Sequence, residues 1–304
     1  MTPAQWLLEP WTYEFMQRAL VVTGVAAVVC ALLSCWLVLV GWSLLGDAVS
    51  HAVLPGVVAS YVLGLPFALG ALVFGLGAVG LIGAVRSRTT LREDTAIGVV
   101  FTALFALGVV GVSVTPSHID LSHILFGNVL GVSQTDFVQV VVLGAATMLT
   151  LVLLRRDLTL VAFDPVHAHA LGLSPRRVRW VLLVALAITV VVALQAVGVV
   201  LVVAMVITPG ATARLLTDRL PRMLVVAPVI GLVSAVIGLQ ASFHLDAASG
   251  AMVVLVQSVL FAGALVVRSL RSGRAASAAG RRTAATDSPP ESPPAADTRV
   301  KESP

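Results

Sequence analysis

Residues 46–56 carry the two side chains whose types and spacing best suit chemistry within an apolar chain. Asp47 and His51 are four positions apart, so on a helix both side chains project from one face. A carboxylate and an imidazole together suit a first-row divalent metal such as manganese, iron or zinc. Pro55 has no backbone N–H and is expected to weaken the helix beside the pair. The alternative is an Asp that caps a helix and a His that bonds a neighbouring carbonyl.

Two further groups of His and Asp lie in intervals that contain neither lysine nor arginine. They are candidate outer-loop residues that either bind metal directly or form the docking face for an extracytoplasmic partner. In loops such side chains are more often solvated or cap a helix, and the first Asp could cap a short helix. The groups are His118, Asp120 and His123, followed by Asn128 and Asp136, and then His244 and Asp246.

Residues 155–179 form an arginine-rich interval that contains a second recognisable pattern. An Asp followed by Pro is typical of a helix N-cap with proline at the first helical position, and a later Gly marks the end of the helix. Two histidines lie two positions apart and diverge on a helix, which argues against a shared metal ion. The pattern predicts a short helix that is either a surface element or a plug for a cytoplasmic partner. Its residues include Asp164, Pro165, His167, His169, Ala170 and Gly172.

The run Thr208-Pro209-Gly210 lies inside an apolar stretch. Proline in a helix interior removes a backbone hydrogen bond and clashes with the preceding turn, so a broken membrane helix is expected here. Broken helices at membrane depth are tolerated where they are buried or line a cavity. The run therefore either lines the path of a transported ion or is a kink at a packing contact.

Composition indicates that these residues lie in a membrane protein. Of the 304 residues, 58% are hydrophobic and 11% are charged, and mean hydropathy is +1.01, far outside the range of water-soluble proteins. Seven of the 19 basic residues lie in the last 37 positions, so the basic pI does not indicate a nucleic-acid partner. The one lysine, Lys301, is among them, and no P-loop lysine is present. ATP hydrolysis would therefore need a separate subunit.

Membrane spans are expected where ionisable residues are missing over about 20 positions. Eight or nine helices are predicted, with a division at Gly64-Leu65-Pro66 and either two crossings or a re-entrant element between positions 180 and 213. Arginine clusters should face the cytoplasm, which favours nine crossings with the N-terminus outside and the C-terminus in the cytoplasm. The clusters are Arg86, Arg88 and Arg92; Arg155, Arg156, Arg176, Arg177 and Arg179; Arg214, Arg219 and Arg222; and Arg268, Arg271 and Arg274.

Three regions follow from these patterns. Residues 1–18 are expected to form an interfacial segment, and residues 19–267 the transmembrane domain. Residues 268–304 are rich in Arg, Ser, Ala, Pro and Glu and cannot bury enough apolar surface to offset their conformational entropy. This last region is predicted to be a disordered cytoplasmic tail.

Taken in order, these motifs resemble the permease subunit of ATP-binding-cassette (ABC) importers for manganese, zinc or iron, the ABC-3 type, and most of all its manganese branch. The resemblance covers residues 19–267, and several such strings in one order are specific to the family. The strings lie at positions 46–56, 93–98, 120–128, 163–172, 207–213 and 244–246.

The resemblance implies an all-α polytopic membrane protein, similar to type II ABC importers, in which two copies form a dimeric pore. It implies three protein partners besides membrane lipid: an ATP-binding subunit, a metal-loaded solute-binding protein outside, and a second permease subunit. Asp47 and His51 would be the intramembrane metal-contacting pair, and residues 164–172 the coupling helix that docks on the ATPase. The divalent metal would be the transported substrate, with no permanently bound cofactor, and the chain itself would not be an enzyme.

Two other functions remain open from the residues alone. A secondary metal carrier driven by protons or sodium usually holds more than one buried carboxylate, whereas Asp47 is the only acidic residue well inside an expected span. A membrane scaffold would use the polar motifs for packing and capping. If the importer prediction holds, His51 must be neutral to bind metal, so transport should weaken in acid.

Overall fold

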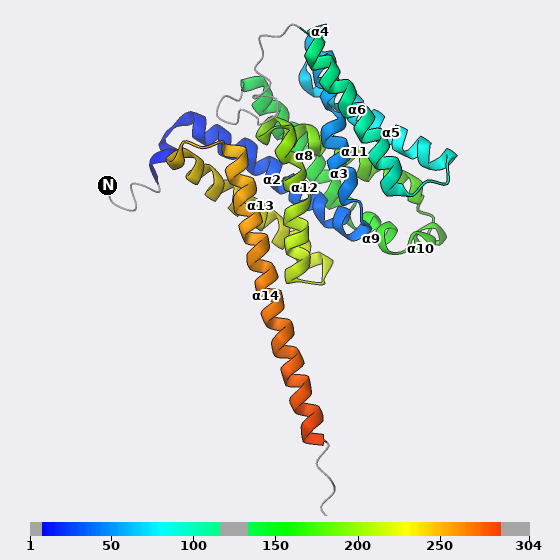
Figure 1. The fold of residues 1–304 in the computed structure, drawn as a ribbon, viewed down its shortest axis with the longest axis vertical. Helices are drawn as coiled ribbons and strands as arrows, with labels where there is room; N and C mark the ends of the chain where they lie inside the picture. Colours follow the sequence, from blue (N-terminus) through cyan, green and yellow to red (C-terminus); the bar gives the residue numbers. More distant parts are fainter. Residues whose placement is uncertain (1–7, 116–132, 287–304) are drawn as a thin grey trace, which may run out of the picture. The chain divides into compact units, whose positions relative to one another are not determined.

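The computed structural model describes residues 8–115 and 133–286, and every regular element within these residues is a helix (Figure 1). The all-α prediction is thus confirmed there. The elements in chain order are η1 (Glu9–Thr12), α2 (Glu14–Val40), α3 (Ser43–Ala52), α4 (Leu54–Leu63), α5 (Phe67–Arg88), α6 (Glu93–Val114), α8 (Gln134–Leu153), α9 (Arg155–Phe163), α10 (Pro165–Ala170), α11 (Pro175–Val197), α12 (Val199–Leu216), α13 (Leu220–Leu245) and α14 (Ser249–Thr286).

Eight helical segments in the described residues are long and apolar enough to cross a membrane. They are α2, α3 together with α4, α5, α6, α8, α11, α13 and the first part of α14. The apolar part of α12, Val202–Leu216, is shorter than these eight. The whole of α12 has 18 residues and rises about 27 Å, close to the roughly 30 Å hydrocarbon core of a bilayer. The prediction of eight or nine spans is confirmed, with α12 as the segment on which the number depends.

The core of the compact unit, Met1–Leu265, is built around α2. This helix packs against α8, α11, α12 and α13. Its buried residues lie on all sides, from Met16 through Trp36, which is what a helix that is apolar all round requires. Cys30 and Cys35 are both buried in it as free thiols. The other spans therefore assemble around a helix that has little contact with lipid.

Small residues let α4 and α5 come into backbone contact. A Cβ atom added to Gly70 would overlap the carbonyl of Gly56 and the hydroxyl of Ser60. The backbone N–H of Gly70 donates a hydrogen bond to Ser60 Oγ over 3.1 Å. Gly64, with φ of 65°, makes the left-handed turn between the two helices. The predicted division of this apolar stretch at positions 64–66 is confirmed.

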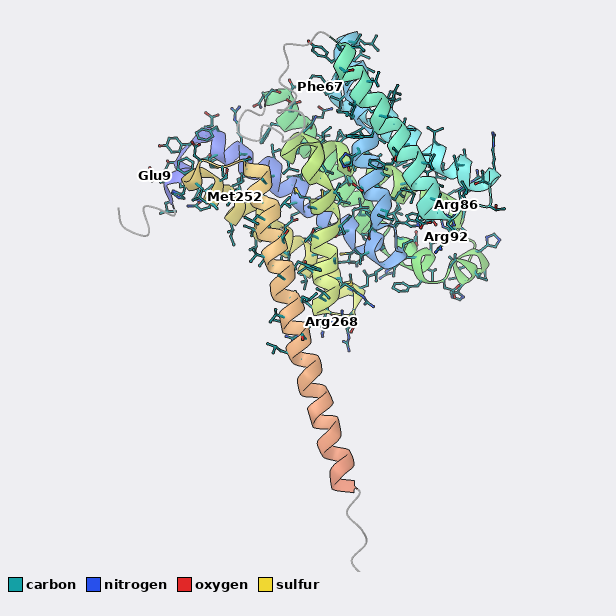
Figure 2. All side chains as sticks on the ribbon, viewed as in Figure 1. Glu9, Phe67, Arg86, Arg92, Met252 and Arg268 are labelled. Atoms are coloured by element: carbon teal, nitrogen blue, oxygen red, sulfur yellow. The ribbon has the colours of Figure 1, made fainter. Side chains whose placement is uncertain are left out.

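Basic residues gather where helices end. Figure 2 shows Arg86 and Arg92 at one end of α5, opposite Phe67. Arg86 pairs with Glu93 at 3.0 Å, and both line a cavity of about 230 Å³ together with Pro165 of α10 and Arg179 of α11. The first two arginine clusters therefore lie at the same end of the bundle, as the positive-inside pattern predicts.

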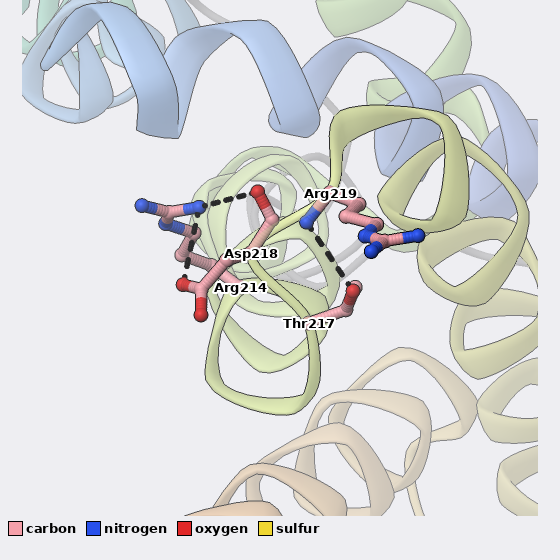
Figure 3. A network of polar contacts seen from close by, with 4 residues as sticks. All are labelled: Arg214, Thr217, Asp218 and Arg219. Carbon is pink, nitrogen blue, oxygen red and sulfur yellow. Dashed lines mark hydrogen bonds and ion pairs between the residues drawn. The ribbon is translucent and has the colours of Figure 1, made fainter.

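The turn between α12 and α13 belongs to the third arginine cluster (Figure 3). Arg214 Nη1 donates a hydrogen bond to the backbone carbonyl of Asp218 at 3.2 Å and lies 3.4 Å from its carboxylate Oδ1. The backbone N–H of Arg219 donates to Thr217 Oγ1 at 3.3 Å. These local hydrogen bonds stabilise the turn, and none of them involves an apolar side chain of either helix.

The predicted helix break at Thr208-Pro209-Gly210 is wrong. Pro209 lies inside α12, which continues to Leu216. Gly210 sits so close to Ser34 of α2 that a Cβ there would overlap Ser34 backbone atoms. Packing against α2 thus holds the helix together despite the missing N–H of the proline. The break between α11 and α12 falls instead at Gly198, with φ of 80° and ψ of 167°.

Both ends of the predicted transmembrane region also need correction. α2 begins at Glu14, where Arg18 and Glu14 form an i,i+4 ion pair, so part of the expected interfacial segment is the first turn of a span. α14 continues to Thr286, so the expected disorder from residue 268 is wrong for residues 268–286. Alanine, arginine and serine there allow a polar helix to continue. Residues 287–304 lie outside the described residues.

We expect Gly70→Ala to lower the stability of the α4–α5 hairpin by about 1–3 kcal/mol, because the added methyl group has to displace backbone atoms of Gly56. The measurement is the apparent Tm of the purified protein in detergent. Gly77→Ala is the matched control: it is on the same helix, and no atom lies within 4 Å of the added Cβ. Equal apparent Tm values for the two variants would contradict the close contact.

Candidate functional site

A break between two short helices positions the candidate metal pair. α3 ends at Ala52 and α4 begins at Leu54, with Pro55 at the start of α4. Because Pro55 has no N–H, it cannot donate to the carbonyl of His51 four residues earlier. That carbonyl accepts instead from the backbone N–H of Val53. The local weakening expected beside Pro55 is therefore observed as an interruption of the helix.

Asp47 and His51 lie on one face of α3, as their spacing predicts. His51 Nε2 is 3.4 Å from Asp47 Oδ1, and the two side chains are 20% and 38% exposed. Ser50 lies between them in sequence, and its hydroxyl donates a hydrogen bond to the backbone carbonyl of Asp47 at 2.7 Å. The Asp47 carboxylate takes no part in that bond. One carboxylate oxygen and one imidazole nitrogen thus face the same partly accessible space.

The aromatic side chains of α6 fix the plane of the imidazole. The ring centroid of His51 is 5.4 Å from that of Phe101 and 5.4 Å from that of Phe105. The two phenylalanines lie 6.1 Å apart, one helical turn from each other. They form an apolar wall that limits the directions in which Nε2 can point. Phe101 and Phe105 were not predicted as part of the site. The sequence signal for them is the four-residue spacing of two aromatic residues within a span.

The second imidazole nitrogen of His51 is enclosed. Nδ1 is buried and has no hydrogen-bond partner among the described residues. In a neutral imidazole one nitrogen carries the proton and the other is free to accept a bond or bind a metal. With Nδ1 enclosed, Nε2 is the nitrogen that can reach a cation beside Asp47.

One chain supplies only two donors at this position. The described residues contain no group of three or more His, Cys, Asp or Glu side chains that could hold a metal ion. Four or more ligands are usual for first-row divalent metals in stable protein sites. Asp47 and His51 alone therefore form part of a coordination shell, which water or another chain has to complete.

The candidate outer-loop residues do not join this pair in the described part of the chain. His118, Asp120, His123 and Asn128 lie outside the described residues. Asp136 belongs to the first turn of α8, where its carboxylate accepts from the Ser133 hydroxyl at 2.6 Å and its N–H donates to Ser133 Oγ. It is therefore part of a helix cap.

The placement of His244 in a loop is wrong. His244 lies in the last turn of α13, with its Nε2 3.1 Å from Gln240 Nε2. Asp246 is the residue after the helix, with φ of 49° in the left-handed region, so it ends α13. The sequence does not distinguish an Asp that ends a helix in the left-handed conformation from an Asp in a loop. The end of α13 was therefore predicted to be part of a loop.

The Asp-Pro pattern at positions 164–172 forms the predicted short helix, α10. Asp164 caps it by accepting from the His167 backbone N–H at 2.8 Å, and Pro165 occupies the first turn. Gly172, with φ of 82°, follows its end. His167 and His169 are both exposed, as is Ala170.

Around α10 several apolar side chains face outward. Phe163, Val166 and Leu171 are 64%, 79% and 62% exposed. We call these three residues the α10 patch. Exposed apolar groups beside a well-capped helix are typical of a protein contact surface.

The predicted pore residues are placed by α12. Thr208, Pro209 and Gly210 are helical, and Pro209 and Gly210 are buried. Thr212 Oγ1 donates a hydrogen bond to the Thr208 carbonyl at 2.7 Å. Gly210 of this run packs closely against Ser34 of α2.

Comparison with known proteins agrees with this arrangement. Residues 12–268 match the ABC 3 transport family. The chain is 49% identical over 261 residues to the manganese transport system membrane protein MntB of Synechocystis sp., which covers 86% of this chain and 85% of that protein. It is 45% identical over 263 residues to the chelated iron transport system membrane protein YfeD of Yersinia pestis, covering 86% and 89%.

A solved structure shares the fold. PsaBC from Streptococcus pneumoniae, in complex with Fab, superposes with a TM-score of 0.79 at 38% identity and covers 86% of this chain and 94% of that one. With the eight candidate spans, these similarities establish a multi-pass membrane protein. The chain therefore belongs to the ABC 3 transport family, and it is a membrane permease of the metal-importing ABC type.

Proposed function

We propose that this permease forms the translocation pore of an ATP-driven importer of divalent metal ions, with manganese as its main substrate. The observation that carries the proposal is the pairing of Asp47 and His51 at a helix interruption within a span. An oxygen and an imidazole donor suit manganese, iron and zinc alike. Manganese is favoured by the 49% identity to a manganese relative, against 45% to an iron relative.

The site is suited to passage, because the described residues of one chain offer the cation two donors at this position. A second copy that faces the first across the pore would bring a second Asp47 and His51, for four protein donors in all. The carboxylates offset part of the cost of removing the cation's water. A coordination shell formed by two chains also separates when the chains move relative to each other. The ion is then released without unfolding of either subunit.

The same proposal assigns the two ends of the bundle to different partners. The arginine clusters face the cytoplasm, which puts the N-terminus outside and the C-terminus inside. A separate ATP-binding subunit docks on the α10 patch, and a metal-loaded solute-binding protein docks on the opposite end. Because the P-loop lysine is missing from the sequence, the permease depends on that ATPase for energy.

A physical connection between α10 and the metal pair supports this division of labour. The cavity of about 230 Å³ is lined by Pro165 of α10 and by Trp42, the residue that precedes α3. α3 is only ten residues long and carries both Asp47 and His51. If the ATPase displaced α10, the residues around this cavity would transmit the movement to the first turn of α3.

The function is tested by uptake of radiolabelled manganese into proteoliposomes that hold the permease, its ATPase and the solute-binding protein. We expect uptake that requires ATP and all three proteins, and unlabelled manganese should compete more strongly than zinc or iron. Uptake by the permease alone, driven by a proton or sodium gradient, would instead establish a secondary carrier. A scaffold would support no uptake under either condition.

We expect Asp47→Asn and His51→Gln each to reduce ATP-dependent manganese uptake at least about tenfold, because even the loss of a group that only hydrogen-bonds a metal ligand typically costs about 10–100-fold in metal affinity or activity. Each substitution keeps the size of the side chain and removes a metal donor. The control is Asp218→Asn, which removes the exposed carboxylate near Arg214, far from α3 in sequence. If assembled Asp47→Asn and His51→Gln transporters retain full uptake, the pair is not on the metal path.

We expect Asp164→Ala to lower uptake while the ATPase subunit continues to hydrolyse ATP, because loss of the N-cap destabilises α10 by about 1 kcal/mol. Asp164→Asn should keep most of the uptake, since Asn is an equally good N-cap. The ratio of manganese transported to ATP hydrolysed is the measurement. Equal ratios for the two variants would argue against a role of the capped helix in coupling.

A further inference from the structure

A cavity of about 650 Å³ opens between α2, α8, α9 and α13. It is separate from the space around Asp47 and His51. Its size is within the range of small-molecule sites in proteins. Its lining residues are Leu32, Trp36, Val152, Arg155, Arg156, Thr159, Leu160, Leu220, Pro221, Leu224 and Val225.

The lining has a charged end and an apolar body. Arg155 and Arg156 are exposed, and neither takes part in an ion pair with another described residue. The one carboxylate next to them in sequence is that of Asp157, so positive charge is in excess. Trp36 Nε1 donates a hydrogen bond to Thr159 Oγ1 at 3.3 Å, and both residues line the same cavity.

Apolar surface also lies along three of these helices, α2, α8 and α13. A second groove of about 420 Å³ has almost no polar surface. Its residues precede those of the first cavity on α2 and α8 and follow them on the antiparallel α13. They are Leu20, Val21, Gly24, Val25, Val28, Val29, Val141, Gly144, Ala145, Met148 and Leu232.

This path is long enough to cross one leaflet of a bilayer. The two grooves together run along α2 from Trp36 back to Leu20, about 24 Å at 1.5 Å per residue, of which the part from Trp36 to Val25 is about 16 Å. Half of a roughly 30 Å hydrocarbon core is about 15 Å. An acyl chain with its headgroup beside Arg155 would therefore end near Val25.

We propose that this groove holds an acidic phospholipid of the cytoplasmic leaflet, with its phosphate on Arg155 and Arg156 and an acyl chain along α2. Guanidinium groups bind phosphate oxygens through paired N–H donors, and basic pockets between helices on the cytoplasmic side are suited to acidic headgroups. The proposal rests on the proposed orientation, with arginines inside, but not on the metal pair. Bound lipid would fix α9 against α2 and α13, next to the α10 patch.

The test is the lipid retained by the permease after purification with its ATPase subunit from membranes that contain phosphatidylglycerol and phosphatidylethanolamine, measured by native mass spectrometry. We expect wild type to retain phosphatidylglycerol preferentially, and Arg155→Gln/Arg156→Gln to retain several-fold less. Arg176→Gln/Arg177→Gln is the matched control, an adjacent exposed arginine pair that does not line the cavity. Equal losses in both double variants, or no loss in either, would overturn the proposal.

A second pair of variants tests the apolar part without changing charge. Val225 is 64% exposed and lines the cavity, whereas Val229, one turn later on α13, lines neither groove. We expect Val225→Trp to displace the lipid and Val229→Trp to leave it bound. If Val225→Cys instead forms a disulfide between two copies of the chain in membranes, a second subunit occupies the groove and the lipid assignment is wrong. Lipid retention needs no transport, so failure here is distinct from failure of the proposed import function.

Discussion

The structure depends on one constraint: inside a bilayer each backbone N–H and C=O has to be bonded within the protein. Helices satisfy this locally, so an interruption is costly and needs support. The span formed by α3 and α4 is interrupted at Val53. Two ionisable side chains, Asp47 and His51, precede this interruption on α3. In the proposed function, the translocation site combines this weakened helix with the two side chains that we propose bind the metal.

The same constraint explains why the spans were predictable. Ionisable side chains are costly in hydrocarbon, so their absence marks a span, and arginines mark the cytoplasmic ends. The Asp47 and His51 arrangement was also predictable, because an i,i+4 pair shares a face on any helix. The capped helix at Asp164 follows from equally local chemistry. These features depend on neighbours within one or two turns.

Features that depend on distant neighbours were not predictable. Pro209 was expected to break its helix, but the contact of Gly210 with Ser34, 176 positions away, decides the outcome. Phe101 and Phe105 meet His51 only because α6 packs against α3, and no local pattern shows which helices will be neighbours. His244 and Asp246 mark a helix end that resembles a loop in sequence. In the first two cases tertiary packing overrides or completes a local preference, whereas the third is a local ambiguity between a helix C-cap and a loop.

The shortness of α3 gives the proposed mechanism its physical basis. A ten-residue helix is about 15 Å long, half the thickness of the hydrocarbon core, so it crosses only one leaflet. Its beginning adjoins Trp42 and the cavity shared with α10, and its end is the interruption before Pro55. A short rigid element with a weak joint at one end can tilt without stretching its own hydrogen bonds. Because Asp47 and His51 both lie on this element, a tilt moves them together. In the proposed mechanism, such a tilt opens the metal shell formed by two copies without either side chain leaving its helix.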